Sequence, residues 1–297
     1  MIFLTVCSAD EFQNFIPPFA YTALRAYPDA KVKIFLRGRL DEDNKRLLPL
    51  IKGDLDIEED SFLNYKYGES FCNTMRYLVP EKTFDGHDLA YVTDVDFLIF
   101  RQDPSHWSYH KEMMRKSRTC CSAFRSAVRG PKRPEVTKIG WVGKYTRMVC
   151  GTTMLDLPTW LPSTRQYRKQ YKAIVKAQVG DKKDSVPACT YREYDEVMLA
   201  RICKMARLPI PQATNHFAHG EKFDMRYRDI HLGDFKFDKR WTSIKKMRRM
   251  LTDGNVKFFT RMHRDDETWN KIYEVCVRKK LVGRCLKNLR THAKARL

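Results

Sequence analysis

Two hydrophobic patterns alternate along the first hundred residues. Short apolar runs with the β-branched and aromatic residues that strands favour are separated by segments whose apolar residues recur at helical spacing. The predicted strands are 2–7, 32–36, 55–57 and 89–93, and the predicted helices are 15–27, 41–51 and 74–78. This alternation predicts an α/β fold in which helices flank a mostly parallel sheet.

The pattern becomes less regular after residue 100. We expect helices at 107–117, 167–177 and 195–205, a strand at 148–157, and a connection rich in glycine, proline and basic residues at 127–144. After residue 236 the chain is strongly basic and keeps a helical pattern. We therefore divide it into an α/β core over 1–240, which we expect to bind a nucleotide, and a basic, mainly helical C-terminal extension over 241–297.

The net charge is the unusual part of the composition. A hydrophobic share of 43% over 297 residues is ordinary for a globular protein and argues against a disordered, collagen-like or coiled-coil chain. However, 56 Lys and Arg residues face only 36 Asp and Glu residues, which leaves a charge of +20. Such an excess predicts an acidic partner, either nucleic acid, an anionic membrane surface or a phosphorylated substrate.

Targeting signals and cysteine motifs add little. No apolar run is long enough to cross a bilayer, and the apolar start of the chain lacks the basic leader of a signal peptide. The nine cysteines are scattered and contain no C-x-x-C, so neither a zinc site nor a disulfide framework is expected. These features favour a cytoplasmic protein with free thiols.

Two carboxylates interrupt the apolar run 91–100 and are the main candidates for chemistry. In a strand, residues i and i+2 share a face, so Asp94 and Asp96 should converge while Val95 points away. Adjacent buried carboxylates repel each other and are costly to desolvate, and a divalent cation removes both penalties. Hard oxygen ligands select Mg²⁺ or Mn²⁺. The alternative is a strand end whose aspartates cap a turn.

Asp94-Val95-Asp96 resembles the D-x-D motif of metal-dependent glycosyltransferases with the GT-A fold. Three other segments follow the order of the retaining, glycogenin- and galactosyltransferase-like branch: 76–80, 195–199 and 231–236. Between its His and Gly the last segment is one residue shorter than is usual in that branch, no Pro-Trp follows it, and Glu196 replaces the usual Gln. Residues 1–110 also resemble uncharacterised bacterial and phage glycosyltransferase-like proteins.

The resemblance implies a metal-dependent, retaining transfer of a hexose or pentose from a nucleotide sugar, with a UDP-sugar as the expected donor. It implies that Mn²⁺ or Mg²⁺ is held by Asp94, Asp96 and His231. The other implied contacts are Arg76 near the donor sugar, Asp195 on the transferred sugar, Lys236 on the diphosphate, and Thr5, Val6 and Phe12 around the uracil and ribose.

Each of these residues also has an ordinary structural explanation. His231 fits a surface or core histidine, Asp195 fits a helix N-cap, and Arg76 fits a surface ion pair. The chain contains no Walker loop, no G-x-G-x-x-G and no Ser/His/Asp grouping. A dehydrogenase or a nucleophilic hydrolase therefore has little support.

The acceptor must be inferred from charge. Basic residues interleave with aromatic ones between Trp160 and Lys176, a pattern typical of nucleic-acid-binding surfaces. It favours DNA carrying a hydroxylated base, as in phages that glycosylate their own genomes, with no protein partner implied. A second hypothesis is a peripheral membrane enzyme that glycosylates a lipid-linked or cell-surface glycan and docks through 241–251 or 269–289. A non-enzymatic nucleic-acid-binding protein would explain the charge but not the two aspartates.

Overall fold

A six-stranded sheet with the order β3-β2-β1-β4-β7-β6 is the centre of the fold. Its strands are β1 (Ile2–Ser8), β2 (Lys31–Arg37), β3 (Asp54–Glu58), β4 (Leu89–Val92), β6 (Cys121–Arg129) and β7 (Thr146–Asp156). The computed structural model describes residues 1–64, 70–129, 146–177, 194–209, 217–218, 221–222, 227, 229–235 and 251–294.

Parallel and antiparallel pairs both occur in this sheet. β2 pairs with β3 and β1 pairs with β4 in parallel, and Phe3 lies opposite Tyr91. β7 is antiparallel to both β4 and β6. The expected mostly parallel sheet with flanking helices is confirmed. The strand β6 was not predicted, because Ser and Arg residues interrupt its apolar pattern and its last three residues fall within the connection predicted at 127–144.

Most predicted elements agree with the structure to within one or two residues, but two helices do not. The helix predicted at 74–78 is wrong: α3 (Ser70–Met75) ends earlier, and a turn follows it. The helix predicted at 167–177 begins ten residues earlier, as α5 (Leu157–Ala177). Pro158 and Pro162 concealed its start, although a proline is well tolerated in the first turn of a helix.

The described chain forms two compact units. The first contains Met1–Val6, Phe62–Thr93 and Trp107–Phe223, and the second contains Cys7–Ser61, Asp94–His106 and Asp224–Leu297. The predicted boundary near residue 240 falls outside the described residues, so the division into a catalytic domain and an extension stays a prediction.

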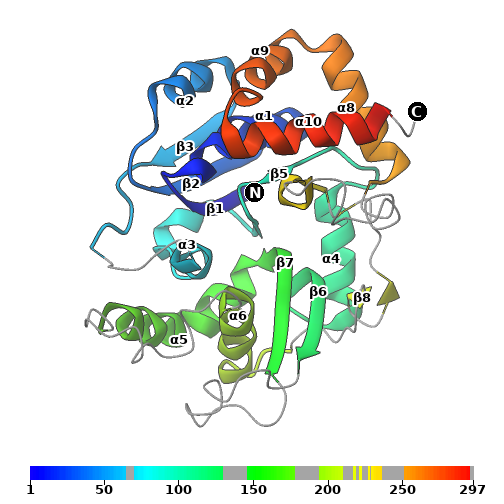
Figure 1. Cartoon of the computed structure of the whole chain (residues 1–297). Helices are drawn as coiled ribbons and strands as arrows, with labels where there is room; N and C mark the ends of the chain where they lie inside the picture. The colour runs from blue at the N-terminus through cyan, green and yellow to red at the C-terminus, as the bar shows by residue number, and fades with distance from the viewer. Residues whose placement is uncertain are drawn as a thin grey trace. The chain divides into compact units, whose positions relative to one another are not determined.

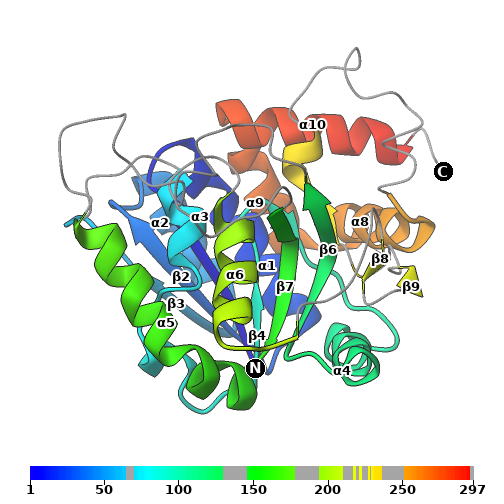
Figure 2. The same cartoon turned by 90° about the horizontal axis from the view of Figure 1, so that it is seen from below.

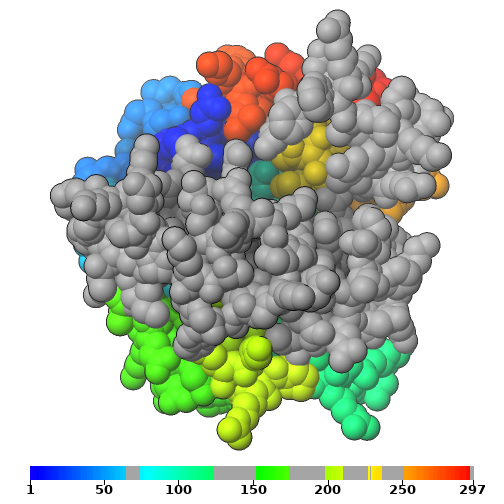
Figure 3. All heavy atoms as spheres, turned by 60° about the horizontal axis from the view of Figure 1, so that its bottom comes forward, coloured from blue at the N-terminus to red at the C-terminus, as the bar shows by residue number. Residues whose placement is uncertain are grey.

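In the first unit, α6 (Tyr194–Met205) packs on β7 and α5 lies beside α6 (Figure 2). Trp160 of α5 is fully buried there. Arg168 is buried as well: its guanidinium lies 4.9 Å from the centre of the Trp160 ring and donates hydrogen bonds to the backbone oxygens of Tyr77, at 3.0 Å, and Val79, at 2.8 Å. The opposite side of α5 lies at the surface (green in Figure 3).

The second unit contains α1 (Ile16–Ala26), α2 (Glu42–Leu47), α8 (Asp253–Asp265), α9 (Glu267–Cys276) and α10 (Lys280–Lys294). Figure 1 shows α9 beside α1, and α10 packs on the 3-10 helix η1 (Glu11–Phe15) that precedes α1. Asp266 caps α9 by accepting the backbone N–H of Trp269 at 2.9 Å. It also accepts hydrogen bonds from Tyr21 Oη, at 2.6 Å, and Arg25 Nε, at 2.7 Å, and so joins α9 to α1.

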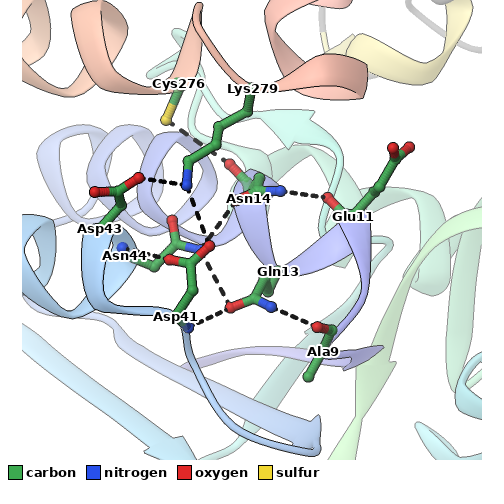
Figure 4. A network of polar contacts seen from close by, with 9 residues as sticks. All are labelled: Ala9, Glu11, Gln13, Asn14, Asp41, Asp43, Asn44, Cys276 and Lys279. Carbon is green, nitrogen blue, oxygen red and sulfur yellow. Dashed lines mark hydrogen bonds and ion pairs between the residues drawn. The ribbon is translucent and has the colours of Figure 1, made fainter.

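A polar network joins the turn before α10 to the N-terminal part of the second unit (Figure 4). Lys279 Nζ contacts Asp41 Oδ2 at 3.2 Å and Asp43 Oδ2 at 2.5 Å. The side-chain oxygen of Gln13 accepts the backbone N–H of Asp41 at 2.7 Å. The hydrogen bond from Lys279 lowers the pKa of Asp43. The turn before α10 is therefore attached to the start of α2, which follows β2.

Two smaller findings complete the fold. Among the residues that the structure describes, no helix is both long and apolar enough to span a bilayer. The seven cysteines whose side chains the structure describes are buried and form no disulfide with one another.

Candidate metal centre

The two aspartates lie just after the carboxyl end of β4. That strand ends at Val92, and a turn at Val95 and Asp96 precedes the short strand β5 (Phe97–Leu98). The prediction that Asp94 and Asp96 share one face of a continuous strand is therefore wrong. They converge because the chain turns between two strands that belong to different sheets.

His231 reaches this turn through a second strand. β10 (Ile230–His231) pairs antiparallel with β5, so that His231 lies opposite Phe97. The backbone N–H of Leu232 donates to the backbone oxygen of Asp96 at 2.7 Å. The rings of His231 and Phe97 stack at 4.6 Å with an interplanar angle of 20°. The pairing brings residues 135 positions apart in the sequence into one site.

The potential ligand atoms of Asp94, Asp96 and His231 all lie within 4.8 Å of one another. His231 Nε2 is 3.1 Å from Asp96 Oδ2, and the two side chains are 26% and 12% exposed. The site is thus shielded but accessible. Two carboxylates and one imidazole form a ligand set that suits Mn²⁺ and also accommodates Mg²⁺.

Gly233 keeps the space between these ligands open. A Cβ atom at this position would lie 2.5 Å from Asp96 Oδ2 and 2.9 Å from His231 Nε2. Both distances are shorter than a Cβ atom tolerates, so any larger residue would displace the ligands. The residues present therefore fit a divalent cation in both chemistry and space.

The electrostatics of the site favour a positive charge. Burial alone would lower the pKa of His231, but the charge of Asp96 and the hydrogen bonds to Asp234 and Asp96 outweigh it and raise this pKa to about 10. His231 Nδ1 lies 3.3 Å from Asp234 Oδ1. Carboxylates thus flank the imidazole on both of its nitrogen sides.

A buried network fixes the chain just before His231. Asp229 is fully buried with φ of +61° and accepts hydrogen bonds from the backbone N–H of Phe100, at 3.2 Å, and from His106 Nε2, at 2.8 Å. His106 Nδ1 lies 2.5 Å from Tyr27 Oη. Burial raises the pKa of Tyr27, so its hydroxyl stays protonated. The network anchors the start of β10.

The predicted donor-binding residues fall in several places. Arg76 is only 2% exposed and lies in the turn after α3, so it is not a surface ion-pair residue. The side chains of Thr5 and Val6 are buried in β1. Phe12 is half-buried in the 3-10 helix η1 (Glu11–Phe15), where its backbone N–H donates to Asp10 Oδ1 at 2.9 Å.

Two predicted residues cannot be judged. Asp195 is the second residue of α6, but its side chain lies outside the description, and Lys236 lies outside the described residues altogether. The structure therefore brings together the three predicted metal ligands, while the roles of Arg76, Asp195, Lys236, Thr5, Val6 and Phe12 stay predictions.

The basic and aromatic pattern over 160–176, which was expected to bind nucleic-acid bases, is only partly a surface: Tyr167 is half-buried and Lys169 is exposed. Trp160 and Tyr171 are buried, as is Arg168, and exposed Arg165 pairs with Glu81 at 3.0 Å. Trp160 and Tyr171 belong to the apolar face of an amphipathic helix.

The segment 269–289, which was expected to dock on a membrane, also contains a buried aromatic residue: Trp269 is fully buried beside Tyr21.

Sequence reasoning did not assign roles to three residues of the site: Phe97, Gly233 and Asp234. The signal was present in the short segment His231-Leu232-Gly233-Asp234. A glycine two residues after a candidate ligand suggests a close approach, and a neighbouring carboxylate suggests a partner for the imidazole. Only the pairing of β10 with β5 shows that Gly233 lies beside Asp96 and His231, and that Asp234 lies beside the imidazole of His231.

Comparison with known proteins gives distant structural matches alone. No protein-family model matches the chain, and no curated protein is significantly similar to it. The galactosyltransferase LgtC, solved with donor and acceptor sugar analogues, aligns with a TM-score of 0.38 and 11% identity over 71% of this chain and 98% of its own. Core-mannan synthase A from Aspergillus fumigatus, in its Mn/GDP form, aligns with a TM-score of 0.41 and 10% identity over 68% of this chain and 69% of its own. At these TM-scores the likeness carries no inference about activity.

Proposed function

We propose that the protein is a metal-dependent glycosyltransferase that moves a sugar from a nucleotide sugar to an acceptor. The observation that carries the proposal is the convergence of Asp94, Asp96 and His231 around a space that Gly233 leaves open. The aspartates directly follow a parallel strand of an α/β sheet, and ligands in such folds bind beyond the carboxyl ends of strands.

The residues match the demands of this reaction. Breaking the bond between the sugar and the diphosphate builds positive charge on the sugar and negative charge on the leaving group. When bound, a divalent cation neutralises that negative charge. Asp94, Asp96 and His231 would hold the Mn²⁺ or Mg²⁺. The ring of Phe97 stacks on the imidazole of His231 and so limits its rotation.

The remaining roles complete the proposal. We assign Arg76, Asp195 and Lys236 to the donor sugar and diphosphate, and Thr5, Val6 and Phe12 to the nucleotide. The donor is a UDP-sugar, and the transfer retains the anomeric configuration.

Ligand-dependent thermal stability tests the donor site. We expect UDP with Mn²⁺ to raise the melting temperature of the wild type by several degrees, because a ligand bound at 100 times its Kd adds about 2.7 kcal/mol to the free energy of unfolding. UDP or Mn²⁺ alone should do less. Asp96→Asn should remove the effect, whereas Asp265→Asn on the exposed end of α8 should keep it. If UDP with Mn²⁺ stabilised Asp96→Asn as much as the wild type, the proposal would be contradicted. Repeating the measurement with a panel of nucleoside diphosphates identifies the nucleotide.

The acceptor that we propose is DNA carrying a hydroxylated base. Its support is the charge of +20 and the outer face of α10, where Lys280, Arg284, Lys287, Arg290 and Lys294 are exposed and no acidic residue interrupts them. Phosphate backbones bind such surfaces through counterion release. Hydroxymethylated DNA should therefore accelerate release of the nucleoside diphosphate, and unmodified DNA should not.

The same experiment separates the two other hypotheses. Acceleration by lipid-linked glycans on anionic vesicles, with no response to DNA, would favour the peripheral membrane enzyme. Binding of DNA with no turnover of any nucleotide sugar would favour a non-enzymatic nucleic-acid-binding protein. We place the enzyme in the cytoplasm, where nucleotide sugars and genomic DNA meet, in bacterial or phage-infected cells.

A further inference from the structure

The two ring nitrogens of His231 face different carboxylates. Nε2 lies 3.1 Å from Asp96 Oδ2, on the side that Gly233 leaves open, and Nδ1 lies 3.3 Å from Asp234 Oδ1. A neutral imidazole carries one N–H and one lone pair, and the proton's position decides which nitrogen can bind a metal. Asp234 is thus the carboxylate beside the ring nitrogen that does not face Asp96.

Asp234 is itself held in place at both ends of its turn. It belongs to the 3-10 helix η7 (Leu232–Phe235), whose first residue donates its backbone N–H to the backbone oxygen of Asp96 at 2.7 Å. At the other end, Asn288 Nδ2 of α10 donates to the backbone oxygen of Phe235 at 2.7 Å. Half-buried Asp234 is therefore fixed by the ligand-bearing turn on one side and by the C-terminal helix on the other.

We infer that Asp234 is a positioning residue of the metal centre: it accepts the Nδ1–H of His231 and so directs the Nε2 lone pair to the cation. The inference rests on the proposed function, because it supposes that the centre binds a metal. Asp234 acts through His231 and not as a ligand, since the group of converging ligand atoms consists of Asp94, Asp96 and His231. Ligating histidines commonly have such a carboxylate partner, whose loss weakens metal binding.

Mn²⁺ titration followed by electron paramagnetic resonance, without any nucleotide sugar, tests this role. We expect Asp234→Ala to weaken Mn²⁺ binding by about 10- to 100-fold. Asp234→Asn keeps a side-chain oxygen that can accept the Nδ1–H, so it should recover most of the affinity. The matched control, Asp265→Asn, should bind Mn²⁺ within about twofold of the wild type, because Asp265 is exposed and pairs with Arg264.

A double-mutant cycle shows whether the effect passes through His231. In a His231→Ala background, Asp234→Ala should cause no further loss of Mn²⁺ affinity. An equal loss in both backgrounds would overturn the inference, and so would an Asp234→Ala protein that binds Mn²⁺ like the wild type while His231→Ala does not. Either result would leave the proposed function intact. A wild type that binds no Mn²⁺ would overturn both proposals. If Asp234→Ala does not fold, the Mn²⁺ affinity of Asp234→Asn is compared with that of the wild type instead. A loss of affinity of more than about 100-fold in Asp234→Asn would contradict the inference.

Discussion

Gly233 is the smallest residue of the candidate metal centre and the one whose size matters most. A Cβ at this position would meet two of the three ligands. We expect Gly233→Ala to weaken Mn²⁺ binding by at least about tenfold, because the ligands must move apart to admit the methyl group. Isothermal titration calorimetry measures this affinity.

Gly254 provides the matched control for this substitution. An added Cβ there would meet only Thr252 Oγ1, at 3.9 Å, which is an ordinary contact. Gly254→Ala should therefore bind Mn²⁺ with wild-type affinity. If Gly233→Ala did so as well, the space between the ligands would have no role in metal binding.

At the same scale, the sequence was sufficient to predict the three candidate ligands that the structure brings together, but not the residues around them. Asp94 and Asp96 could be predicted because two carboxylates in an apolar run have few structural explanations. The functions of Gly233 and Asp234 could not, because they depend on the pairing of His231 with Phe97, which no local pattern encodes. The burial of Arg76 is another tertiary property that a sequence motif does not reveal.

At the scale of elements, Asp266 is the main polar link between α1 and α9. It caps α9 and accepts hydrogen bonds from Tyr21 and Arg25 while its side chain is 11% exposed. We expect Asp266→Ala to lower the free energy of unfolding by about 2–3 kcal/mol, through loss of the cap and of buried hydrogen bonds. The adjacent exposed Asp265 is the control: Asp265→Ala should leave stability close to that of the wild type, because surface ion pairs contribute little. Urea unfolding measures the free energy of unfolding of both variants. Equal losses in the two variants would show that the hydrogen bonds of Asp266 do not stabilise the fold.

His263 of α8 gives these helices a predicted pH dependence. Burial, aided by the charge of Arg290, lowers the pKa of His263 from 6.5 to about 4. Between about pH 6.5 and pH 4 the unfolded chain then binds a proton that the folded protein does not, so stability falls as the pH falls through this window. His263→Phe should reduce the total loss of stability between pH 6.5 and pH 4 by an amount on the order of 1–2 kcal/mol, since the ring is partly exposed. Urea unfolding at a series of pH values checks it, and an unchanged slope would contradict the assignment to His263.

The elements themselves were predictable where hydrophobic periodicity dominated. The strands near the N-terminus and the helix α6 were found within one or two residues because their apolar patterns are clear. Strand β6 and the start of α5 were missed because polar residues and prolines obscured the pattern, while tertiary packing on β7 determines both.

For the whole molecule, net charge makes a prediction about partners. We expect affinity for DNA to fall linearly with salt on logarithmic axes, with a slope set by the number of phosphates contacted. Arg284→Glu with Lys287→Glu on the exposed face of α10 should lower both the affinity and the slope. Lys45→Glu with Arg46→Glu changes the net charge equally on α2 and should have a smaller effect. Equal effects would mean that overall charge, and not α10, determines binding.

Metal-dependent release of nucleoside diphosphate from a nucleotide sugar tests the central claim most directly. The purified protein would be incubated with a panel of nucleotide sugars, with and without Mn²⁺, in the absence of acceptor. We predict slow release that requires Mn²⁺ and falls by at least about a hundredfold in Asp94→Asn, but not in Asp265→Asn. A rate of release that is the same with and without Mn²⁺, or the same in Asp94→Asn as in the wild type, would contradict the account of this site.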